Sequence, residues 1–581
     1  MDTILEGGWV FDGLGRPPLR QDVGLEGGQV VAMGAGPLPR APHTRVVDAR
    51  GLWVMPGFVD IHTHYDAEVE LAPSLSESLR HGITSVVLGS CSLSLATGTP
   101  EDLADMFCRV EAIPYATVRE LLEQKKDWEG LGAYLEHLDR LPLGPNVASF
   151  IGHSALRAQV MGLERSLTPG VLPTADELAR MQREVQVGLD AGYLGLSIQT
   201  LPWDKMGGSR EFRSRPLPST YARWSEYRHL TRVLRERGRV LQGVPNVSTK
   251  VNVVLFLLES MGLWRKPLKT TVISMMDPRA NRGIHRVIGA LSRFFNRVLG
   301  ADFRWQALPE LFDLWADGID LVVFEEFGAG TAALHLQEPG ARARLLRDPA
   351  FRRRFKRQWT SRFLPKVFHR DFNQSRILAC PEPQLEGRSF ADVARERGQH
   401  PVDAFLDLVA THGERLRWYT VMANDRPQAL DEILQHPDIL VGFSDAGAHL
   451  RQMAHYNFPL RLLHRVREAQ QRGAPFLTPE RAVQRLTGEL AGWLGLDAGT
   501  LQVGRRADVV LVDPAGLTEA VEQAHEAPME NFGGLVRLVR RNPGAVRGVW
   551  VNGRRAVQDG ELLPEVGRER GFGRLLRAKP Q

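Results

Sequence analysis

Cysteine is scarce in this chain, and its scarcity limits the class of protein. Only three cysteines occur among 581 residues, and they are Cys91, Cys108 and Cys380. Their odd number and irregular spacing exclude a small disulfide-stapled scaffold and favour a reducing compartment. In such a compartment, a cysteine with a special role acts as a metal ligand or as a nucleophile.

Long apolar runs and a strong charge bias are also missing. The most apolar stretch, residues 251–263, is interrupted by polar residues and is too short to cross a bilayer. The first residues lack the basic and apolar regions of a secretory signal. Lys plus Arg number 73 and Asp plus Glu number 68, so the net charge is +5. For a chain of this length, that excess does not indicate nucleic-acid binding.

The overall composition is that of a folded globular protein, with 43% hydrophobic and 24% charged residues. We therefore expect a cytoplasmic soluble protein. We expect neither a nucleic-acid partner nor a membrane partner. The sequence leaves homo-oligomerisation open.

The two ends of the chain are rich in short β-type segments. Residues 1–55 contain several such runs, separated by Gly, Pro and Asp turn signals. Residues 488–581 contain the strand-like run 507–514 and a predicted hairpin with Asn552-Gly553 at its tip, a pair that favours a type I′ turn. We predict one small β-sandwich domain built from both termini, with two separate β modules as the alternative.

Residues 56–487 alternate strand-like and helix-like segments, which predicts βα units around a parallel sheet. The eight candidate strands are mostly continuous apolar runs, as expected where both faces of a sheet are covered. Eight such units predict an α/β fold, a TIM-like (β/α)8 barrel. A helix is expected over residues 175–191, with Thr174 as its N-cap. The candidate strands are residues 58–64, 83–91, 147–153, 194–200, 239–244, 269–275, 418–422 and 439–444.

The interval between the sixth and seventh candidate strands, residues 277–417, is too long for a single helix. We predict a helical insertion in the barrel there. It contains an arginine-rich stretch, residues 341–357, which we interpret as a solvated helical surface. A patch for an anionic partner is the alternative, but the stretch has few interleaved aromatic residues.

The strongest chemical signal is the run Pro56-Gly-Phe-Val-Asp-Ile-His62-Thr-His64. Side chains two residues apart on a strand project to the same side. At the carboxyl end of a first barrel strand, both imidazoles would face the barrel mouth, where TIM-barrel enzymes keep their active sites. Two neutral imidazoles there suit Zn²⁺ or a similar divalent ion, so we predict metal binding by His62 and His64.

Two more candidates stand where predicted strands end. Cys91 closes the second strand, and a thiolate is a good zinc ligand, although a small buried core residue is an equal alternative. Asp445 closes the last strand, where a carboxylate can contact the metal and accept a proton from water. Its small neighbours at 446–448 would leave room for a substrate. A helix-capping role is the alternative for Asp445.

Motifs that are typical of one known enzyme superfamily occur over nearly the whole length of the chain. They are His62-Thr-His64-Tyr-Asp66, Gly89-Ser-Cys91, Ile151-Gly-His153-Ser-Ala-Leu-Arg157, Ser444-Asp445-Ala-Gly-Ala-His449 and Gly504-Arg-Arg-Ala-Asp-Val-Val-Leu-Val-Asp-Pro. Together they resemble the amidohydrolase superfamily and, within it, the N-acyl-D-amino-acid deacylase (D-aminoacylase-like) branch. The resemblance implies a TIM-like barrel with a small β-sandwich and metal-assisted amide hydrolysis. It also implies that Cys91 is the unusual thiolate ligand of that branch and Asp445 the catalytic base.

The chain departs from that branch where further metal ligands are expected. The branch usually places one histidine at the end of the fifth strand and another at the end of the sixth, but residues 240–246 and 271–277 contain none. The fourth candidate strand also lacks the bridging lysine of hydantoinase-type relatives. The four residues named above can hold one ion, whereas a second would need His153, His449 or Asp277. The resemblance therefore implies one or two divalent ions.

Four residues are candidates for contacts around the substrate. His153, at the end of the third strand, would polarise a substrate carbonyl, and Arg157 would pair with a carboxylate. Satisfied structural roles are the alternative for both. We place His449 in the same set, and we expect Asp66 to orient a ligand histidine from behind.

We predict a metal-dependent amidohydrolase that cleaves the amide bond of a small N-acyl amino acid or a related amide. Zn²⁺ is the expected cofactor, and the D configuration of the substrate rests on the resemblance alone. Two alternatives stay open. One is another C–N hydrolase of the superfamily, such as one that opens a cyclic amide. The other is a metal-poor binding protein on the same scaffold, which the missing histidines favour.

Overall fold

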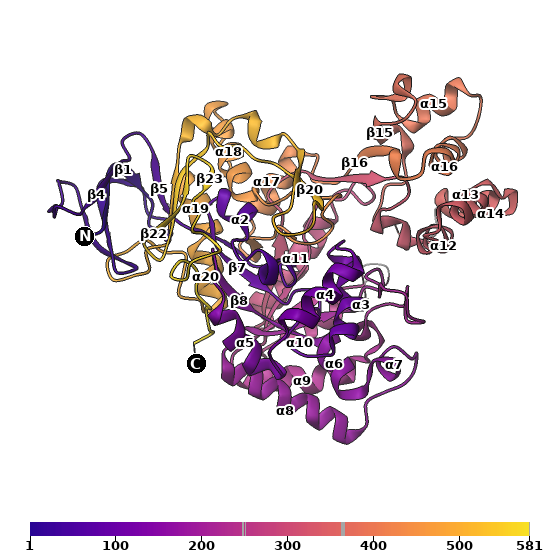
Figure 1. Cartoon of the computed structure of the whole chain (residues 1–581), viewed down its shortest axis with the longest axis horizontal. Coiled ribbons are helices and arrows are strands. Elements are labelled where there is room, and N and C mark those ends of the chain that lie inside the picture. The colour runs from indigo at the N-terminus through magenta and orange to yellow at the C-terminus, as the bar shows by residue number, and fades with distance from the viewer. Residues whose placement is uncertain (247–248, 250, 362–365, 580–581) are drawn as a thin grey trace.

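The protein is described from a computed structural model that covers residues 1–246, 249, 251–361 and 366–579. Strands from the two ends of the chain gather at one end of the molecule, and helices α12 to α16 gather at the other (Figure 1). Helices and parallel strands lie between them. The fold is mixed α/β.

One nine-stranded sheet contains strands from both termini. Its order is β23-β22-β21-β18-β5-β1-β2-β3, and β4 pairs with β1. The two halves meet where β5 pairs antiparallel with β18. At the predicted hairpin between β21 and β22, Asn552 and Gly553 have φ of 48° and 77°, as a type I′ turn requires. The strands are β1 (Thr3–Val10), β2 (Leu19–Glu26), β3 (Gln29–Gly34), β4 (Arg45–Asp48), β5 (Trp53–Pro56), β18 (Val509–Val512), β21 (Val546–Val551), β22 (Arg554–Gln558) and β23 (Glu561–Leu562).

The middle of the chain forms two parallel sheets, ordered β6-β7-β8 and β9-β10-β11-β12-β13-β17. Only Phe150 separates β8 from β9, and its amide donates to the carbonyl of Leu88 at 3.0 Å. At the other edge, the amide of Ile61 donates to the carbonyl of Gly442 at 2.8 Å, so the segment after β6 lies beside the segment after β17. The strands are β6 (Phe58–Asp60), β7 (Ile83–Leu88), β8 (Asn146–Ser149), β9 (Ile151–Gly152), β10 (Gly195–Gln199), β11 (Val240–Val244), β12 (Lys269–Val272), β13 (Asp302–Ala307) and β17 (Ile439–Val441).

The structure corrects the seventh predicted strand. Residues 418–422 belong to β16 (Arg417–Ala423), which pairs antiparallel with β14 (Phe312–Asp317) and β15 (Ser375–Ala379). The parallel partner of β12 is instead β13, which lies inside the interval 277–417 that was predicted to be the insertion. Both segments have β-forming sequences, and the sequence pattern alone does not specify which partner a strand finds.

Helices cover the parallel strands. Further helices lie in residues 308–438, between β13 and β17, a segment that we call the excursion after β13. The predicted helix after Thr174 is present as α8, with a capping box between Thr174 and Glu177. The arginine-rich stretch forms α13 and α14, which pack against a second core that is separate from that of the parallel strands and rich in aromatic rings. The helices of the first part are α1 (Glu68–Leu71), α2 (Ser76–Arg80), α3 (Pro100–Val110), α4 (Tyr115–Lys125), α5 (Gly130–Arg140), α6 (His153–Met161), α7 (Leu163–Ser166), α8 (Ala175–Ala191), α9 (Trp224–Glu236), α10 (Val251–Ser260) and α11 (Ile284–Val298).

The remaining helices are α12 (Gly328–His335), α13 (Pro339–Arg347), α14 (Pro349–Trp359), α15 (Phe390–Glu396), α16 (Pro401–His412), α17 (Pro427–Gln435), α18 (Phe458–Gln471), α19 (Pro479–Leu486) and α20 (Gly488–Leu494). A two-stranded sheet pairs β19 (His525–Pro528) with β20 (Val536–Val539). Across the described ranges, none of these helices has both the length and the apolar character that a membrane crossing requires.

Candidate metal centre and adjoining pocket

His62 and His64 lie just beyond the end of β6, in a segment that runs beside the residues after β17. The amide of Asp445 donates to the carbonyl of His62 at 3.2 Å, and the amide of His64 donates to the carbonyl of Ala446 at 2.6 Å. These backbone bonds bring Asp445 against the two imidazoles although nearly four hundred residues separate them in the sequence. Hydrogen bonding between the first and last parallel strands therefore assembles this part of the site.

The side chains of four predicted residues, His62, His64, Cys91 and Asp445, lie close together. His62 Nε2 lies 3.2 Å from Cys91 Sγ and 3.5 Å from Asp445 Oδ1, and His64 Nε2 lies 3.2 Å from Asp445 Oδ1. The ligand atoms of the two histidines and Cys91 all lie within 4.8 Å of one another. This spacing places nitrogen, sulfur and oxygen donors around a common centre, the donor set that zinc prefers.

The backbone at this centre is held in an unusual conformation. Cys91 and Asp445 both have positive φ, 52° and 57°, which side-chain-bearing residues rarely adopt outside functional sites. Gly447 has a φ of +92°, and a Cβ atom there would lie 2.3 Å from the carbonyl oxygen of His64. Glycine is therefore required at position 447 for the segment after β17 to approach the histidines.

Burial and charge set the protonation of these groups. Burial lowers the pKa of His62 to about 4 despite the nearby Asp445, so its imidazole is neutral at pH 7. Burial would raise the pKa of Asp445, but His64 and His62 hold it well below its usual range. Burial raises the pKa of the Cys91 thiol well above its usual value. A cation that binds here must therefore displace the thiol proton, as metal ions do at such ligands.

Gln306, on β13, fixes the orientation of His62. Its Oε1 lies 2.9 Å from His62 Nδ1, and its Nε2 donates to Thr271 Oγ1 at 3.2 Å. Because Nδ1–H donates to this oxygen, the lone pair of Nε2 faces Cys91 and Asp445. Sequence reasoning missed Gln306 because β13 was assigned to the insertion, although the run Asp302–Ala307 contains two aromatic residues between Gly300 and Pro309, a usable strand signal.

Two of the predicted substrate contacts do not join this centre. Arg157 is fully buried, and its Nε donates to Glu226 Oε1 at 2.9 Å. His153 Nε2 lies 3.1 Å from the same carboxylate oxygen, and its Nδ1 lies 3.0 Å from Ser219 Oγ. The guanidinium and the imidazole thus make internal polar contacts at the start of α6.

The other two predicted contacts, Asp66 and His449, lie near the centre but make no hydrogen bond to its histidines within the described residues. Asp66 Oδ2 accepts a hydrogen bond from the amide of Gly89 at 3.2 Å, and burial raises the pKa of Asp66 to about 7. No hydrogen bond joins it to His64, whose Nδ1 has no partner in the described parts of the chain. His449 lies on the wall of the adjoining pocket.

Among the described residues on or after β11 and β12, Gln242 and Asp277 do not supply further ligands. Gln242 Oε1 accepts a hydrogen bond from the amide of Cys91 at 3.3 Å, and its Nε2 donates to Ser90 Oγ at 3.3 Å. Asp277 pairs with Arg426 at 2.6 Å. Over the residues that the structure describes, His62, His64 and Cys91 form the one group of three or more metal-ligating side chains close enough to share an ion.

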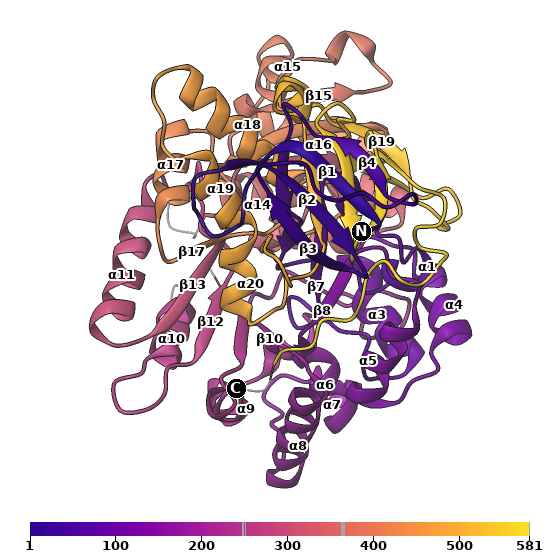
Figure 2. The ribbon, with the colours of Figure 1, turned by 90° about the vertical axis from the view of Figure 1, so that its left-hand side faces the viewer.

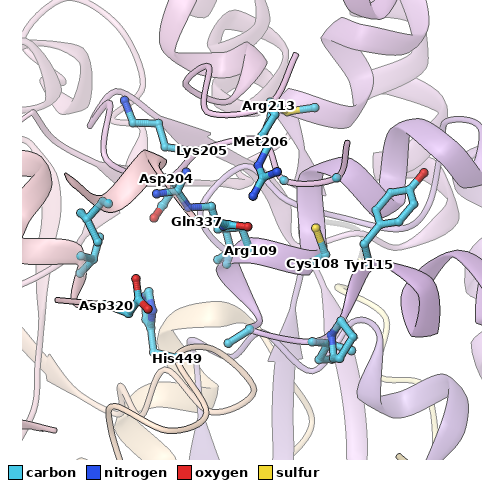
Figure 3. A pocket seen from close by; sticks show the side chains of 18 of the residues that line it. Cys108, Arg109, Tyr115, Asp204, Lys205, Met206, Arg213, Asp320, Gln337 and His449 are labelled. Atoms are coloured by element: carbon cyan, nitrogen blue, oxygen red, sulfur yellow. The ribbon is translucent and has the colours of Figure 1, made fainter. Parts of the chain in front are cut away.

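A large pocket adjoins the centre. Its volume is about 850 Å³, and its walls come from the loop after β10, the end of α3 and the excursion after β13 (Figure 3). Asp204 and His449 lie on its wall, and the charges of Asp204, His64 and Asp445 act on one another. Burial raises the pKa of Asp204, which accepts a hydrogen bond from Gln199 at 2.6 Å. Asp204 was missed at the level of sequence, where it lies in a loop without a recognisable motif.

Arginine and lysine side chains that line the pocket are Arg109, Lys205, Arg213 and Arg342, and the first three are labelled in Figure 3. Arg342 pairs with Asp320 at 3.1 Å. Glu325, from the excursion, pairs with Arg109 at 2.9 Å and with Lys205 at 3.9 Å. Arg213 forms no ion pair with any described residue. Its guanidinium is therefore the cation in this group that is available to an anionic ligand.

Comparison with known proteins agrees with this architecture. A family profile described as "Amidohydrolase family" matches residues 45–194. An uncharacterised protein of Mycobacterium tuberculosis is 48% identical over 99% of this chain and 96% of its own length. An N-acyl-D-aspartate deacylase of Alcaligenes xylosoxydans xylosoxydans is 28% identical over 96% of this chain and 92% of its own. The crystal structure of N-acyl-D-glutamate deacylase from Bordetella bronchiseptica, complexed with zinc and a phosphonate inhibitor, covers 100% of both chains with a TM-score of 0.64 and 23% identity.

Residues 45–194 match the amidohydrolase family, and nearly the whole chain is similar to N-acyl-D-amino-acid deacylases. The family prediction made from the sequence motifs is confirmed. Enzymes of this branch are hydrolases that act on carbon–nitrogen bonds other than peptide bonds.

Proposed function

We propose that this protein hydrolyses the amide bond of an N-acyl-D-amino acid with the help of a divalent metal ion, Zn²⁺. The observation that carries the proposal is the meeting of His62, His64, Cys91 and Asp445 beside a pocket that offers a guanidinium. The named activities of the relatives from Alcaligenes and Bordetella support the same reaction class.

The order of the parallel strands along the chain supports a barrel as the scaffold. Parallel strands follow one another from β6 to β17, and backbone contacts return from β17 to β6, which supports a TIM-like (β/α)8 barrel over residues 56–487. The nine-stranded sheet supports a β-sandwich domain formed by residues 1–55 and 488–581. The insertion then lies between β13 and β17 instead of spanning residues 277–417.

The residues present fit a single ion. Asp445 Oδ1 is buried and makes no hydrogen bond within the described residues, although two imidazole nitrogens lie within 3.5 Å of it. A buried, charged oxygen without a hydrogen bond is costly unless a cation contacts it. His62, His64 and Cys91 would hold the ion and Asp445 would touch it. When bound, such an ion supplies Lewis-acid polarisation of the scissile carbonyl and of the attacking water.

Asp445 has the chemistry of a general base. Its lowered pKa keeps the carboxylate ionised at neutral pH, and its position beside the histidines directs it towards the same centre. In the proposed reaction, Asp445 accepts a proton from water as the oxygen bonds to the acyl carbon. It then passes that proton to the leaving nitrogen as the C–N bond breaks, which releases a carboxylate and an amine.

The pocket supports an acidic substrate. Every N-acyl amino acid carries a carboxylate, and a guanidinium binds a carboxylate through two parallel hydrogen bonds. Arg213 has no ion pair with the described residues, whereas Arg109 and Lys205 pair with Glu325 and Arg342 pairs with Asp320. We therefore assign Arg213 to the substrate carboxylate.

One observation favours a second candidate, a metal-poor binding protein. At the ends of β11 and β12, Gln242 is hydrogen-bonded within the protein and Asp277 is ion-paired, so neither side chain is free to bind a second ion. Elemental analysis of chelator-free protein separates the two functions. About one equivalent of zinc per chain supports the enzyme, and a negligible amount supports the binding protein.

The enzyme itself is tested with zinc-loaded protein and a panel of N-acetyl-D-amino acids, their L-enantiomers and hydantoins. We expect turnover of the D-series, and Asp445→Asn is expected to keep the metal while turnover falls about 100–10,000-fold. Preference for hydantoins would instead show a cyclic-amide hydrolase. Full activity in Asp445→Asn would remove Asp445 from the mechanism.

A further inference from the structure

The outer surface of two neighbouring helices, α10 and α11, has an unusual composition. Surface helices of globular proteins normally expose polar residues and bury an apolar stripe. Here α10 is apolar on nearly all sides, and yet Val254 and Leu258 are exposed. On α11, Val287, Phe294 and Val298 are exposed, and the exposed fraction of Phe294 is 50%. The loop after α10 adds Trp264, which is 92% exposed.

These residues form one surface, which we name the α10–α11 face: Val254, Leu258, Trp264, Val287, Phe294 and Val298. The amide of Gly262 donates to the carbonyl of Leu299 at 3.2 Å, so the loop that carries Trp264 lies against the end of α11. α11 lies between α17 and α10 in both views of the ribbon (Figures 1 and 2).

The geometry of α11 orients its apolar stripe towards α10. Val287, Phe294 and Val298 recur at intervals of seven and four residues, so they share one side of the helix. Arg286 lies on the other exposed side, where it pairs with Glu432 of α17 at 2.6 Å. Because α17 flanks that side, the apolar stripe faces α10 and continues its exposed apolar residues.

Basic residues outnumber acidic ones along this stretch of chain, although Arg286 pairs with Glu432, and Arg279 and Arg282 pair with Asp425. Residues 251–300 contain eight Lys or Arg and only two acidic residues, Glu259 and Asp277. Both acids are buried and paired with arginine. Arg293 and Arg297 repeat the spacing of Arg286 and have no ion-pair partner among the residues described. An apolar stripe beside a basic stripe, with an exposed tryptophan, is the pattern of helices that lie in an anionic lipid interface.

We propose that the α10–α11 face binds the surface of a membrane that contains anionic lipids. The apolar side chains would enter the headgroup region, and Arg293 and Arg297 would pair with phosphates. A second copy of the chain fits less well, because a two-fold contact through this face would bring like charges together. The proposal concerns peripheral binding and is independent of the proposed function. It replaces the expectation from composition that the protein has no membrane partner.

The proposal is tested by flotation of the full chain with two kinds of vesicle. One is pure phosphatidylcholine, and the other is phosphatidylcholine and phosphatidylglycerol in equal parts. We expect binding to the second only, and binding that weakens as salt screens the charges. Two double variants, Trp264→Ser/Phe294→Ser and Arg293→Gln/Arg297→Gln, test the two kinds of contact. Each is expected to lower the affinity for the anionic vesicles by about tenfold or more.

Val187→Ser is the matched control, because Val187 is an exposed apolar residue on another surface helix, α8. It is expected to float like the wild type, and circular dichroism and urea unfolding check that all variants fold. Failure of the wild type to float with anionic vesicles at low salt would overturn the proposal, as would unchanged flotation of both double variants. Sedimentation equilibrium provides the last arm. A dimer that Trp264→Ser/Phe294→Ser dissociates would show that a second copy covers this face.

Discussion

The Nδ1 atom of His62 lies 2.9 Å from the Oε1 atom of Gln306, a residue 244 positions away in the sequence. This contact decides which imidazole nitrogen faces the candidate metal centre. The Gln306 amide is itself oriented by Thr271, to which its Nε2 donates. A buried chain of hydrogen bonds across neighbouring strands β12 and β13 therefore holds His62 with Nε2 towards the candidate centre.

Replacement of Gln306 by methionine is expected to weaken metal binding. Methionine fills a similar volume but removes the oxygen that accepts the Nδ1 proton, so the imidazole loses its fixed tautomer. Comparable changes behind metal ligands cost roughly 10–100-fold in affinity. Competition with a chromophoric chelator measures the effect. Gln306→Glu keeps an acceptor oxygen and is expected to bind the ion more tightly than Gln306→Met, and equal affinity of Gln306→Met and wild type would contradict this role.

Cys91 and Cys380 provide a matched pair, because both are buried free cysteines. Cys91→Ser removes the sulfur that lies 3.2 Å from His62 Nε2, and its metal affinity should fall by more than the roughly 10–100-fold that changes behind the ligands cost. Cys380→Ser lies in the excursion after β13 and should bind metal normally. Loss of the thiolate-to-cobalt absorption band in cobalt-substituted Cys91→Ser is the spectroscopic check, and a retained band would exclude Cys91 as a ligand.

Gly447→Ala is expected to damage both stability and the site. The new Cβ would stand 2.3 Å from the His64 carbonyl oxygen, so the segment that carries Asp445 must move away. Gly495→Ala is the control, because Gly495 also has positive φ, +75°, but no atom within 4 Å of the added carbon. Urea unfolding should show a loss of about 1–2 kcal/mol for Gly495→Ala and a larger loss for Gly447→Ala. Equal losses would show that the contact with His64 imposes no extra cost.

His81 should make the protein less stable at acidic pH. Burial lowers its pKa to about 4, and the unfolded chain has a pKa of about 6.5. The unfolded state thus binds more protons between these values, so the contribution of His81 is complete above pH 6.5 and is lost as pH falls towards 4. From about pH 7 to about pH 5, this loss amounts to about 2 kcal/mol of unfolding free energy.

His81→Leu removes this titration, so its unfolding free energy should fall by about 2 kcal/mol less than that of the wild type over the same interval. Urea titrations at the two pH values measure the difference. His43→Leu, at an exposed histidine, should behave like the wild type. If His81→Leu and wild type lose stability in parallel, the buried His81 is not the group that titrates.

The fold was predictable where local pattern and burial agree. The strands that follow the Pro-Gly entry and precede Cys91 begin where the sequence predicts them, at Phe58 and Ile83. They end earlier than predicted, at Asp60 and Leu88, so the candidate ligands lie in the segments that follow the strands. The turn at Asn552-Gly553 was predictable because few residues adopt positive φ without strain. The seventh parallel strand was wrong because β16 and β13 both look like strands, and only the choice of partner distinguishes them.

In the candidate site too, some residues were predictable from the sequence and others were not. His62, His64, Cys91 and Asp445 were predictable because each stands in a motif at the end of a strand. Gln306, Asp204 and Arg213 were not, because a glutamine in a strand or a charged residue in a loop has no sequence signature of its own. Their roles arise from the residues that they face.

By itself, the sequence determined which residues are candidate ligands, the alternation of strands and helices and the resemblance to a family, since these follow from residue chemistry and short-range patterns. Only the tertiary structure decided that Asp445, after the last parallel strand, lies against two histidines that follow the first one, that Gln306 selects the tautomer of one of them, and that Arg157 is paired with Glu226. The physical reason is that hydrogen bonding and electrostatic interactions depend on distances of a few ångströms, and long-range pairing of the strands sets those distances between residues that no local pattern relates.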